Sequence, residues 1–421
     1  MKPVRPFLCA AILAALCLTS GPAAAELWPP STVVETDPDG DSRWAGRGRA
    51  FSEQASRLEE ALERYREIER RGGWNKVPTD VAMGPESFYD CSRIAALEQR
   101  LIAEGYLRSG STPPPPPRVT VPPPKPRRGE PPRPPPRPAS CQYGRALTEA
   151  MKAFQADRRV LGIGQLGSQT MAQLNRPVEE IVNILERDVG RWRYVSLSPS
   201  GTYLLVNIPF YELIAYERGR EGIRVPVIVG QKSWQTPLFS DELEYIVVNP
   251  DWGIPDSIAK QEIWPLAKRD PNYLRRQGIT ATGGSLRQKP GPNNPLGRIK
   301  FVMPNEHNVY LHDTPGQRAF TAAVRALSHG CIRLAKPIDL ANYLLHDDPQ
   351  WNPRRLQAAI ASGKTQQINL REHVPVHIVY STSRVNDEGR VELRPDVYEM
   401  NKRPAREAQR APSDESLEAW P

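Results

Sequence analysis

The chain has 421 residues and carries 56 Lys and Arg against 48 Asp and Glu, a net charge of +8. A single hydrophobic core rarely grows past about 250 residues, so this length predicts two or three domains. Residues 113–138 hold six basic residues and one Glu, or +5, and the rest of the chain is close to neutral. This balance excludes a basic nucleic-acid-binding domain. No phosphate-binding glycine loop occurs, so we expect no nucleotide.

Residues 1–25 are typical of a secretory signal peptide. Lys2 and Arg5 precede an apolar stretch over residues 7–18, and small residues at 23–25 form a cleavage site. The apolar stretch is shorter than the roughly 20 residues that a transmembrane helix needs, and a retained membrane anchor is the alternative. We expect residues 26–49 and the polar tail 401–421 to be disordered.

Export would leave three cysteines in the mature chain, Cys91, Cys141 and Cys331. In an oxidising compartment an odd number indicates one disulfide and one free thiol. Cys91 and Cys141 lie in the same N-terminal region, so we expect them to pair. Cys331 is then the free thiol.

The N-terminal half shows apolar residues at helical spacing. Helices are expected at 51–71, 92–104, 143–157, after Gly167, and as a linker at 178–189. Fifteen of the chain's 45 prolines fall in residues 113–138, which favours an extended polyproline II segment between the second and third helices. Two interpretations of this insertion stay open, a contact with anionic wall polymers or a partner protein, and a solvated spacer.

From residue 201 onward the composition becomes strand-like. Short β-rich runs occupy 203–208, 210–216, 225–229, 243–248, 298–303, 309–311, 377–381 and 391–393. Their spacing predicts a β-sandwich or barrel rather than alternating β-α units. Helical pieces are expected in an insertion over 255–284, and a helix-like stretch covers 319–326.

The chemistry is concentrated in Ser328-His329-Gly330-Cys331-Ile332-Arg333, with His312 at the end of an upstream strand. Only a thiolate is a strong nucleophile, and a neighbouring imidazole can take the thiol proton. A Cys and a His brought together therefore indicate acyl transfer through a thioester. The alternative is a buried Cys beside a core His.

Two resemblances extend this interpretation. Residues 97–107 and 150–175 resemble the small three-helix peptidoglycan-binding domain of cell-wall enzymes. His312 followed by Ser-His-Gly-Cys resembles the YkuD-type L,D-transpeptidases, and further motifs resemble the large periplasmic subgroup that includes YcbB. These motifs are Gly72-Gly73-Trp74, Val206-Asn207-Ile208-Pro209, Asn249-Pro250-Asp251-Trp252, Leu296-Gly297-Arg298 and Met303-Pro304-Asn305.

The resemblance implies a multidomain protein located in the periplasm and associated with the cell wall. A helical region with a peptidoglycan-binding-like domain would occupy 50–176, and a linker 177–200. A mainly-β catalytic domain, a YkuD-like β-sandwich with short helices, would occupy 201–400. The insertion 255–284 is short for the subgroup, so a lid built from it would cover little of the site.

The same resemblance implies the residue roles. Cys331 would be the nucleophile and His312 the proton acceptor and donor. His329 would position the site and support the oxyanion, and Gly330 would form the turn. Arg333, Ser328 and Asp313 are the expected substrate contacts, with Ser328 also bonding within the turn and Asp313 also orienting His312.

The expected reaction forms 3→3 cross-links between peptidoglycan tetrapeptide stems and releases terminal D-Ala. The same thioester resolved by water would give carboxypeptidase or endopeptidase activity, and resolved by a protein lysine it would attach a protein to the wall. A non-catalytic wall-binding scaffold is the alternative outside the enzyme class. We expect no cofactor. His312, His329 and Cys331 are ligand types that zinc accepts, but the resemblance requires no metal.

Overall fold

The computed structural model describes residues 49–80, 82–110, 140–192 and 201–402, with side chains from residue 54 onward. The expected signal peptide, the proline-rich segment 113–138 and most of the expected tail lie outside these ranges. No helix within the ranges is long and apolar enough to cross a membrane.

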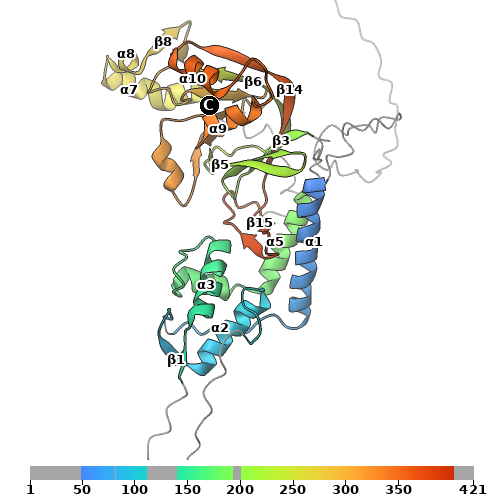
Figure 1. Ribbon diagram of the computed structural model, residues 1–421. Coiled ribbons are helices and arrows are strands. Elements are labelled where there is room, and N and C mark those ends of the chain that lie inside the picture. Colours follow the sequence, from blue (N-terminus) through green and yellow to red (C-terminus); the bar gives the residue numbers. More distant parts are fainter. Residues whose placement is uncertain (1–48, 81, 111–139, 193–200, 403–421) are drawn as a thin grey trace, which may run out of the picture.

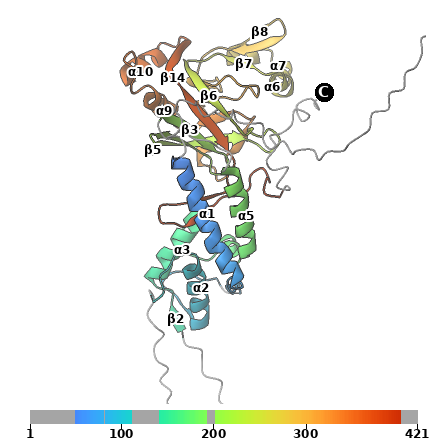
Figure 2. The ribbon, with the colours of Figure 1, turned by 90° about the vertical axis from the view of Figure 1, so that its right-hand side faces the viewer.

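Two long helices form the middle of the molecule. Helix α1, Arg49–Arg70, and helix α5, Val178–Trp192, lie side by side in both views (Figures 1 and 2). Their facing stripes bury Leu58, Leu62, Ile181 and Leu185. Such a stripe is what an amphipathic sequence at 3.6-residue spacing produces.

A small helical region continues from the lower end of these helices. Its elements are β1 Phe88–Asp90, α2 Cys91–Ala103, β2 Ser140–Gln142, α3 Arg145–Asp157 and α4 Ser168–Leu174. Leu97, Leu147 and Phe154 are fully buried in its core. Cys91 and Cys141 form a disulfide across 50 residues of sequence. The bridge lies where β1 pairs with β2, and it encloses the proline-rich segment.

One large sheet organises the C-terminal half. Its strands are β3 Thr202–Asn207, β4 Glu212–Glu217, β5 Arg220–Gly230, β6 Phe239–Val248, β10 Ile299–Val302, β11 Leu311–His312, β12 Ala326–Ser328, β13 Ile332–Leu334 and β14 Gln366–Val379. The order is β12-β5-β13-β11-β10-β6-β14-β3-β4, and β4 also pairs with β5. Eight strands therefore close into a ring, and the mainly-β expectation is confirmed.

The ring is filled by one apolar core. Val227, Ile246, Phe301, Leu311 and Ile332 are each fully buried within it. Two short helices pack against this core, α9 Pro337–Leu344 and α10 Pro353–Ala361. Successive side chains along each strand alternate between the core face and the opposite face of the sheet. Every second residue of a strand therefore remains outside the core.

The insertion 255–284 contains the expected helical pieces and also a hairpin that was not predicted. It begins helically, with α6 Asp256–Ile258, a π-helical turn Ala259–Ile263, α7 Trp264–Arg269 and α8 Tyr273–Gln277. It ends in a hairpin of β8 Ile279–Thr282 and β9 Ser285–Gln288, which pairs with β7 Trp252–Ile254. Gly278 in the left-handed conformation ends α8, and Gly283 and Gly284 with positive φ make the hairpin turn.

The stretch 319–326 is also not the expected helix. Gln317–Thr321 forms a short 3₁₀ helix, and Ala326–Ser328 is strand β12. Parallel pairing of β12 with β5 brings Ser328 beside Gly230. Tertiary strand pairing therefore overrides the local helix propensity of this alanine-rich run.

A second hairpin joins the two halves of the molecule. Strands β15 Ser383–Val385 and β16 Val391–Leu393 pack their valines into the α1–α5 core. Arg158, at the end of α3, donates a hydrogen bond to the carbonyl of Val391. In both views the small helical region and the insertion lie at opposite ends of the molecule (Figures 1 and 2).

Candidate active site

The candidate nucleophile and base come from two neighbouring parallel strands. Strand β11 pairs with β13 so that Leu311 lies opposite Ile332 and His312 opposite Arg333. Leu311 and Ile332 point into the core, so His312 and Arg333 lie on the other face. Cys331 directly precedes β13, one strand across from His312 and two residues before its partner Arg333.

His312 is held as a neutral imidazole. Its ring is 4% exposed, and its Nδ1 lies 2.5 Å from the carbonyl oxygen of Asp313. Nδ1 therefore carries the proton and donates it to that carbonyl, which leaves the lone pair on Nε2. Burial lowers the pKa of His312 from 6.5 to about 3, and the positive charge of Arg333 adds to the effect. The ring is thus a proton acceptor at neutral pH.

Cys331 is a free, partly exposed thiol. Burial of its surroundings raises the pKa of this thiol above the ordinary value, while Tyr310, Lys300 and Arg333 pull it down. The Sγ atom lies 3.9 Å from the carbonyl oxygen of Asn308. In the resting structure the sulfur is therefore a protonated thiol, surrounded by groups that would stabilise its anion.

The turn before Cys331 depends on Gly330. This residue has φ +107°, a region that side chains with a Cβ rarely adopt. The Ser328 hydroxyl donates to the carbonyl of Cys331 at 2.5 Å, and Thr236 Oγ1 donates to the carbonyl of Gly330 at 2.7 Å. Ser328, 2% exposed, thus bonds within the turn as expected and has little surface for a substrate.

The Asp313 side chain is buried and hydrogen-bonded within the protein. Its Oδ2 accepts from the Arg298 backbone N–H at 2.8 Å, and its Oδ1 accepts from the Thr314 N–H at 2.8 Å. Only 3% of the residue is exposed. The expected orienting role fits, since the Asp313 carbonyl fixes the His312 tautomer. The buried carboxylate does not face a space where a substrate would bind.

Arg333 is the expected substrate residue with free bonding capacity. Its Nε is buried without a hydrogen-bond partner, and its guanidinium makes no hydrogen bond or ion pair with the described residues. Burial lowers the pKa of Arg333, while Cys331 and Glu262 act against that shift. A planar cation left unpaired beside the thiol suits a carboxylate ligand.

Comparison with known proteins agrees with this geometry. Residues 201–364 match the family model described as the YkuD L,D-transpeptidase catalytic domain. The chain contains a YkuD domain. A curated Haemophilus influenzae protein, provisionally named an L,D-transpeptidase, is 35% identical over 216 residues, which is 46% of this chain and 44% of that relative. The chain thus spans less than half of that relative's length.

Solved structures give a weaker likeness. An L,D-transpeptidase from Mycobacterium smegmatis is 11% identical with a TM-score of 0.23, covering 42% of this chain and 58% of its own. L,D-transpeptidase 3 from Mycobacterium tuberculosis, in complex with a faropenem-derived adduct, is 13% identical with a TM-score of 0.24. The match covers 42% of this chain and 60% of that structure's chain. At these values the likeness supports no conclusion about this chain.

His329 of the YkuD domain points toward the insertion. Its Nε2 lies 2.9 Å from Oε1 of Glu262 in the π-helical turn, and its ring lies 4.1 Å from that of Trp234. These contacts suit the expected positioning role. They direct one ring nitrogen to a carboxylate and so give no support to the expected oxyanion role.

Three residues near the thiol were not predicted from the sequence. Tyr310 lies two residues before His312, and it lowers the pKa of the Cys331 thiol. Lys300 pairs with His312 across β10 and β11, and its Nζ lies 3.7 Å from the Tyr310 ring centroid. Tyr310 could have been predicted from the sequence, because strand alternation puts it on the same face as His312. Lys300 could be found only from the register of β10 with β11, and Glu262 only from the path of the insertion.

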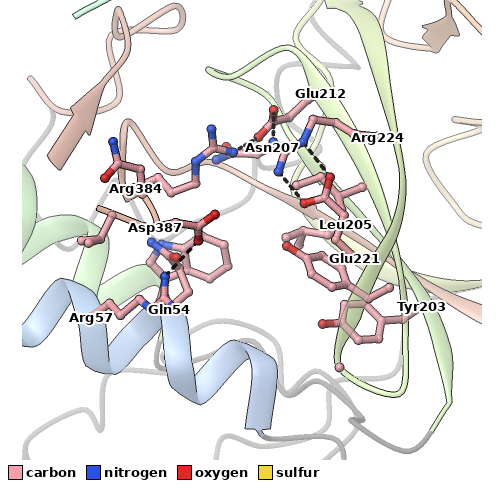
Figure 3. Close-up of a pocket in the computed structure, with 16 residues that line it drawn as sticks. Gln54, Arg57, Tyr203, Leu205, Asn207, Glu212, Glu221, Arg224, Arg384 and Asp387 are labelled. Carbon is pink, nitrogen blue, oxygen red and sulfur yellow. Dashed lines mark hydrogen bonds and ion pairs between the residues drawn. The ribbon is translucent and has the colours of Figure 1, made fainter. Parts of the chain in front are cut away.

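Two other features lie away from these residues. A cavity of about 270 Å³ opens between α1, β3–β5 and β15, where Arg57 pairs with Asp387 and Arg224 with Glu212 and Glu221 (Figure 3). Among the described residues, Glu217, His346 and Asp347 could hold a metal ion. Neither feature includes any of the expected catalytic residues.

Proposed function

We propose that this protein is a periplasmic L,D-transpeptidase that forms 3→3 cross-links in peptidoglycan. The observation that carries the proposal is the free Cys331 thiol one strand away from His312, a buried imidazole whose Nδ1 faces the Asp313 carbonyl. The YkuD match supports a peptidoglycan-modifying acyltransferase. The exact reaction is our inference from the site.

The first half of the reaction acylates the enzyme. His312 Nε2 takes the proton of Cys331, and the sulfur attacks the carbonyl carbon that follows meso-diaminopimelate in a tetrapeptide stem. The C–N bond to terminal D-Ala then breaks, and His312 returns the proton to the leaving amine. A thioester and free D-Ala result.

Backbone geometry can stabilise the developing oxyanion. In the described part of the chain, the Cys331 N–H has no hydrogen-bond acceptor. An N–H at the nucleophile itself is well placed to donate to the substrate oxygen as it becomes negative. Tyr310, Lys300 and Arg333 lower the cost of the transient thiolate.

The second half transfers the acyl group to a second stem. The side-chain amine of its diaminopimelate attacks the thioester carbon, gives its proton to His312, and the C–S bond breaks. The sulfur regains the proton as a thiol. Because the amine must be neutral to attack, a neutral imidazole beside the thioester is the required acceptor.

We assign the remainder of the protein to wall attachment. Export by residues 1–25 would place it in the periplasm, and the region built from α2, α3 and α4 would bind peptidoglycan. The Cys91–Cys141 bridge fits an oxidising compartment.

The test is incubation of the purified protein with tetrapeptide muropeptides and separation of products by mass, beside Cys331→Ala. Cross-linked dimers that lack one D-Ala are expected from the wild type and none from the variant. Shortened monomers alone would show hydrolysis instead of transfer. Absence of turnover, together with absence of a carbapenem adduct on intact protein, would point to a non-catalytic scaffold.

A further inference from the structure

Glu262 of the insertion contacts the catalytic turn at His329. Its carboxylate bonds His329, two residues before Cys331, and acts electrostatically on Arg333, two residues after it. The contact with His329 places this acidic group at the catalytic turn, on the side from which its charge reaches Arg333. It is 48% exposed, so the carboxylate also faces open space.

The position of Glu262 is fixed from two sides. Ala259 and Ile263, which flank it in the π-helical turn, are buried in the insertion's own small core with Ile279 and Leu286. The His329 ring that bonds Glu262 is braced by Trp234 at 4.1 Å. Single π-helical turns often occur at functional sites, where they turn a side chain toward a ligand.

The charges around the thiol have a defined arrangement. Arg333 makes no hydrogen bond or ion pair with a described residue, although the Glu262 charge acts on it, and Glu262 retains an oxygen that bonds no described residue. A ligand that satisfies both must carry an anion and a cation a few ångströms apart. An α-amino-acid head group has this chemistry, since its carboxylate and ammonium share one carbon.

We propose that Glu262 and Arg333 form the acceptor subsite, in which Glu262 binds the ammonium and Arg333 the carboxylate of the head group at the side-chain end of diaminopimelate. This rests on the proposed transfer reaction and names its second substrate. The subsite places the amine beside the Cys331 thioester. Loss of one ammonium proton to solvent produces the neutral amine, and its next proton passes to His312 as the amine attacks the thioester.

The subsite also determines whether the thioester is hydrolysed by water or transferred to an acceptor amine. Water needs neither charged contact, whereas an acceptor amine depends on both. Charge-assisted hydrogen bonds contribute about 1.5–3 kcal/mol, so losing one is expected to weaken acceptor binding about tenfold or more. Removal of the Glu262 charge should therefore favour hydrolysis over transfer.

The experiment uses the full chain with a tetrapeptide donor and a tripeptide acceptor that ends in meso-diaminopimelate. Glu262→Gln keeps the size of the side chain and its capacity to hydrogen-bond His329. We expect its ratio of cross-linked to hydrolysed product to fall about tenfold. Asp256→Asn, the same charge change on an exposed residue of the same insertion, is the matched control and should keep the wild-type ratio.

A second acceptor tests Arg333. Amidation of the side-chain-end carboxylate removes the anion that Arg333 would bind, so the wild type should use the amidated acceptor about tenfold less well. Arg333→Met should use both acceptors equally poorly. Equal use of both by the wild type would overturn the role of Arg333.

The two levels of failure are distinguishable. A wild-type protein without a carbapenem adduct or transfer product would refute the proposed function itself. An adduct together with unchanged ratios in Glu262→Gln and Asp256→Asn would leave the enzyme in place and overturn the subsite. A wild type that forms the adduct but only hydrolyses the donor would also overturn it.

Discussion

Cys331 and His312 are both uncharged at rest, for one physical reason. Burial disfavours the thiolate and the imidazolium alike, so it raises the pKa of Cys331 and lowers that of His312 to about 3. The proton must therefore move when the substrate arrives, rather than beforehand. Tyr310, Lys300 and Arg333 compensate part of this cost by stabilising the anion.

Removing these stabilising groups should make the thiol less reactive. Tyr310 and Lys300 both lower the pKa of Cys331, so Tyr310→Phe, which deletes a hydroxyl, and Lys300→Met, which deletes a positive charge, should both raise it. Alkylation by iodoacetamide, followed from pH 6 to 10, should be several-fold slower near neutral pH in either variant. The exposed Lys364→Met is the control. Unchanged alkylation profiles would contradict the assigned contacts.

His312 should make the domain less stable in acid. Its folded pKa of about 3 lies below the unfolded value of 6.5, so the unfolded chain takes up the proton first as the pH falls. Stability is then lost between pH 6.5 and about 3, with a slope of up to about 1.4 kcal/mol per pH unit. Urea unfolding at pH 7 and pH 5 should show a larger loss for the wild type than for His312→Asn. Parallel losses would refute this assignment.

The sequence contained the reacting atoms but not their full surroundings. Cys331 and His312 were identifiable because a His followed by Ser-His-Gly-Cys resembles the YkuD signature. Whether Ser328 and Asp313 contact a substrate could not be predicted, because both side chains are buried by neighbours such as Arg298 that are distant in the sequence. Glu262 was hidden for the same reason, since an exposed acid in an insertion is usually only solvated.

At the scale of elements, Asp188 joins α5 to the start of β15. The carboxylate is fully buried and accepts from the Ser383 N–H at 2.7 Å and the Ser383 hydroxyl at 2.7 Å. It also pairs with Arg191 at 2.8 Å. One acidic side chain thus fixes the hairpin that connects the helices to the sheet.

Asp188→Ala should be strongly destabilising. It leaves the Ser383 donors and the Arg191 cation without their acceptor in a buried setting, a change that typically costs about 3–5 kcal/mol. The midpoint of urea unfolding measures the loss. Asp387→Ala removes a fully exposed partner of Arg57 and should leave that midpoint unchanged. Similar midpoints in the two variants would contradict the structural role of Asp188.

Element prediction was good where local signals and packing agree. Gly72 and Gly73 end α1 with positive φ, as a glycine pair after an amphipathic run suggests. The helix expected at 319–326 was wrong, and the hairpin at the end of the insertion was not predicted, because strand pairing determines both segments. Ring closure through β4 and β5 was likewise beyond a local pattern.

At the scale of the molecule, the disulfide and the reactive thiol belong to separate regions. Cys91–Cys141 stabilises the small helical region by closing a loop of 50 residues, worth about 4 kcal/mol in chain entropy. Cys331 lies in the YkuD domain. The redox state of one should therefore not control the other.

Replacing both bridge cysteines tests this separation. The Cys91→Ser, Cys141→Ser variant should lose thermal stability in the helical region yet still form a Cys331 adduct with a carbapenem. Calorimetry and intact mass measure the two properties on one sample. Loss of the adduct in well-folded variant protein would show that the two regions are coupled.

The pairing of β4 with β5 affects how the protein can aggregate at high concentration. Because β4 bonds β5, the eight-strand ring has no terminal strand, and the three-residue β12, which pairs only with β5, is the one short edge at its end. In the small sheet built on the insertion, β8 pairs only with β9, so its outer side remains available over four residues. Strand-mediated aggregation at high concentration should therefore start at Ile279–Thr282, and a proline introduced there would suppress it.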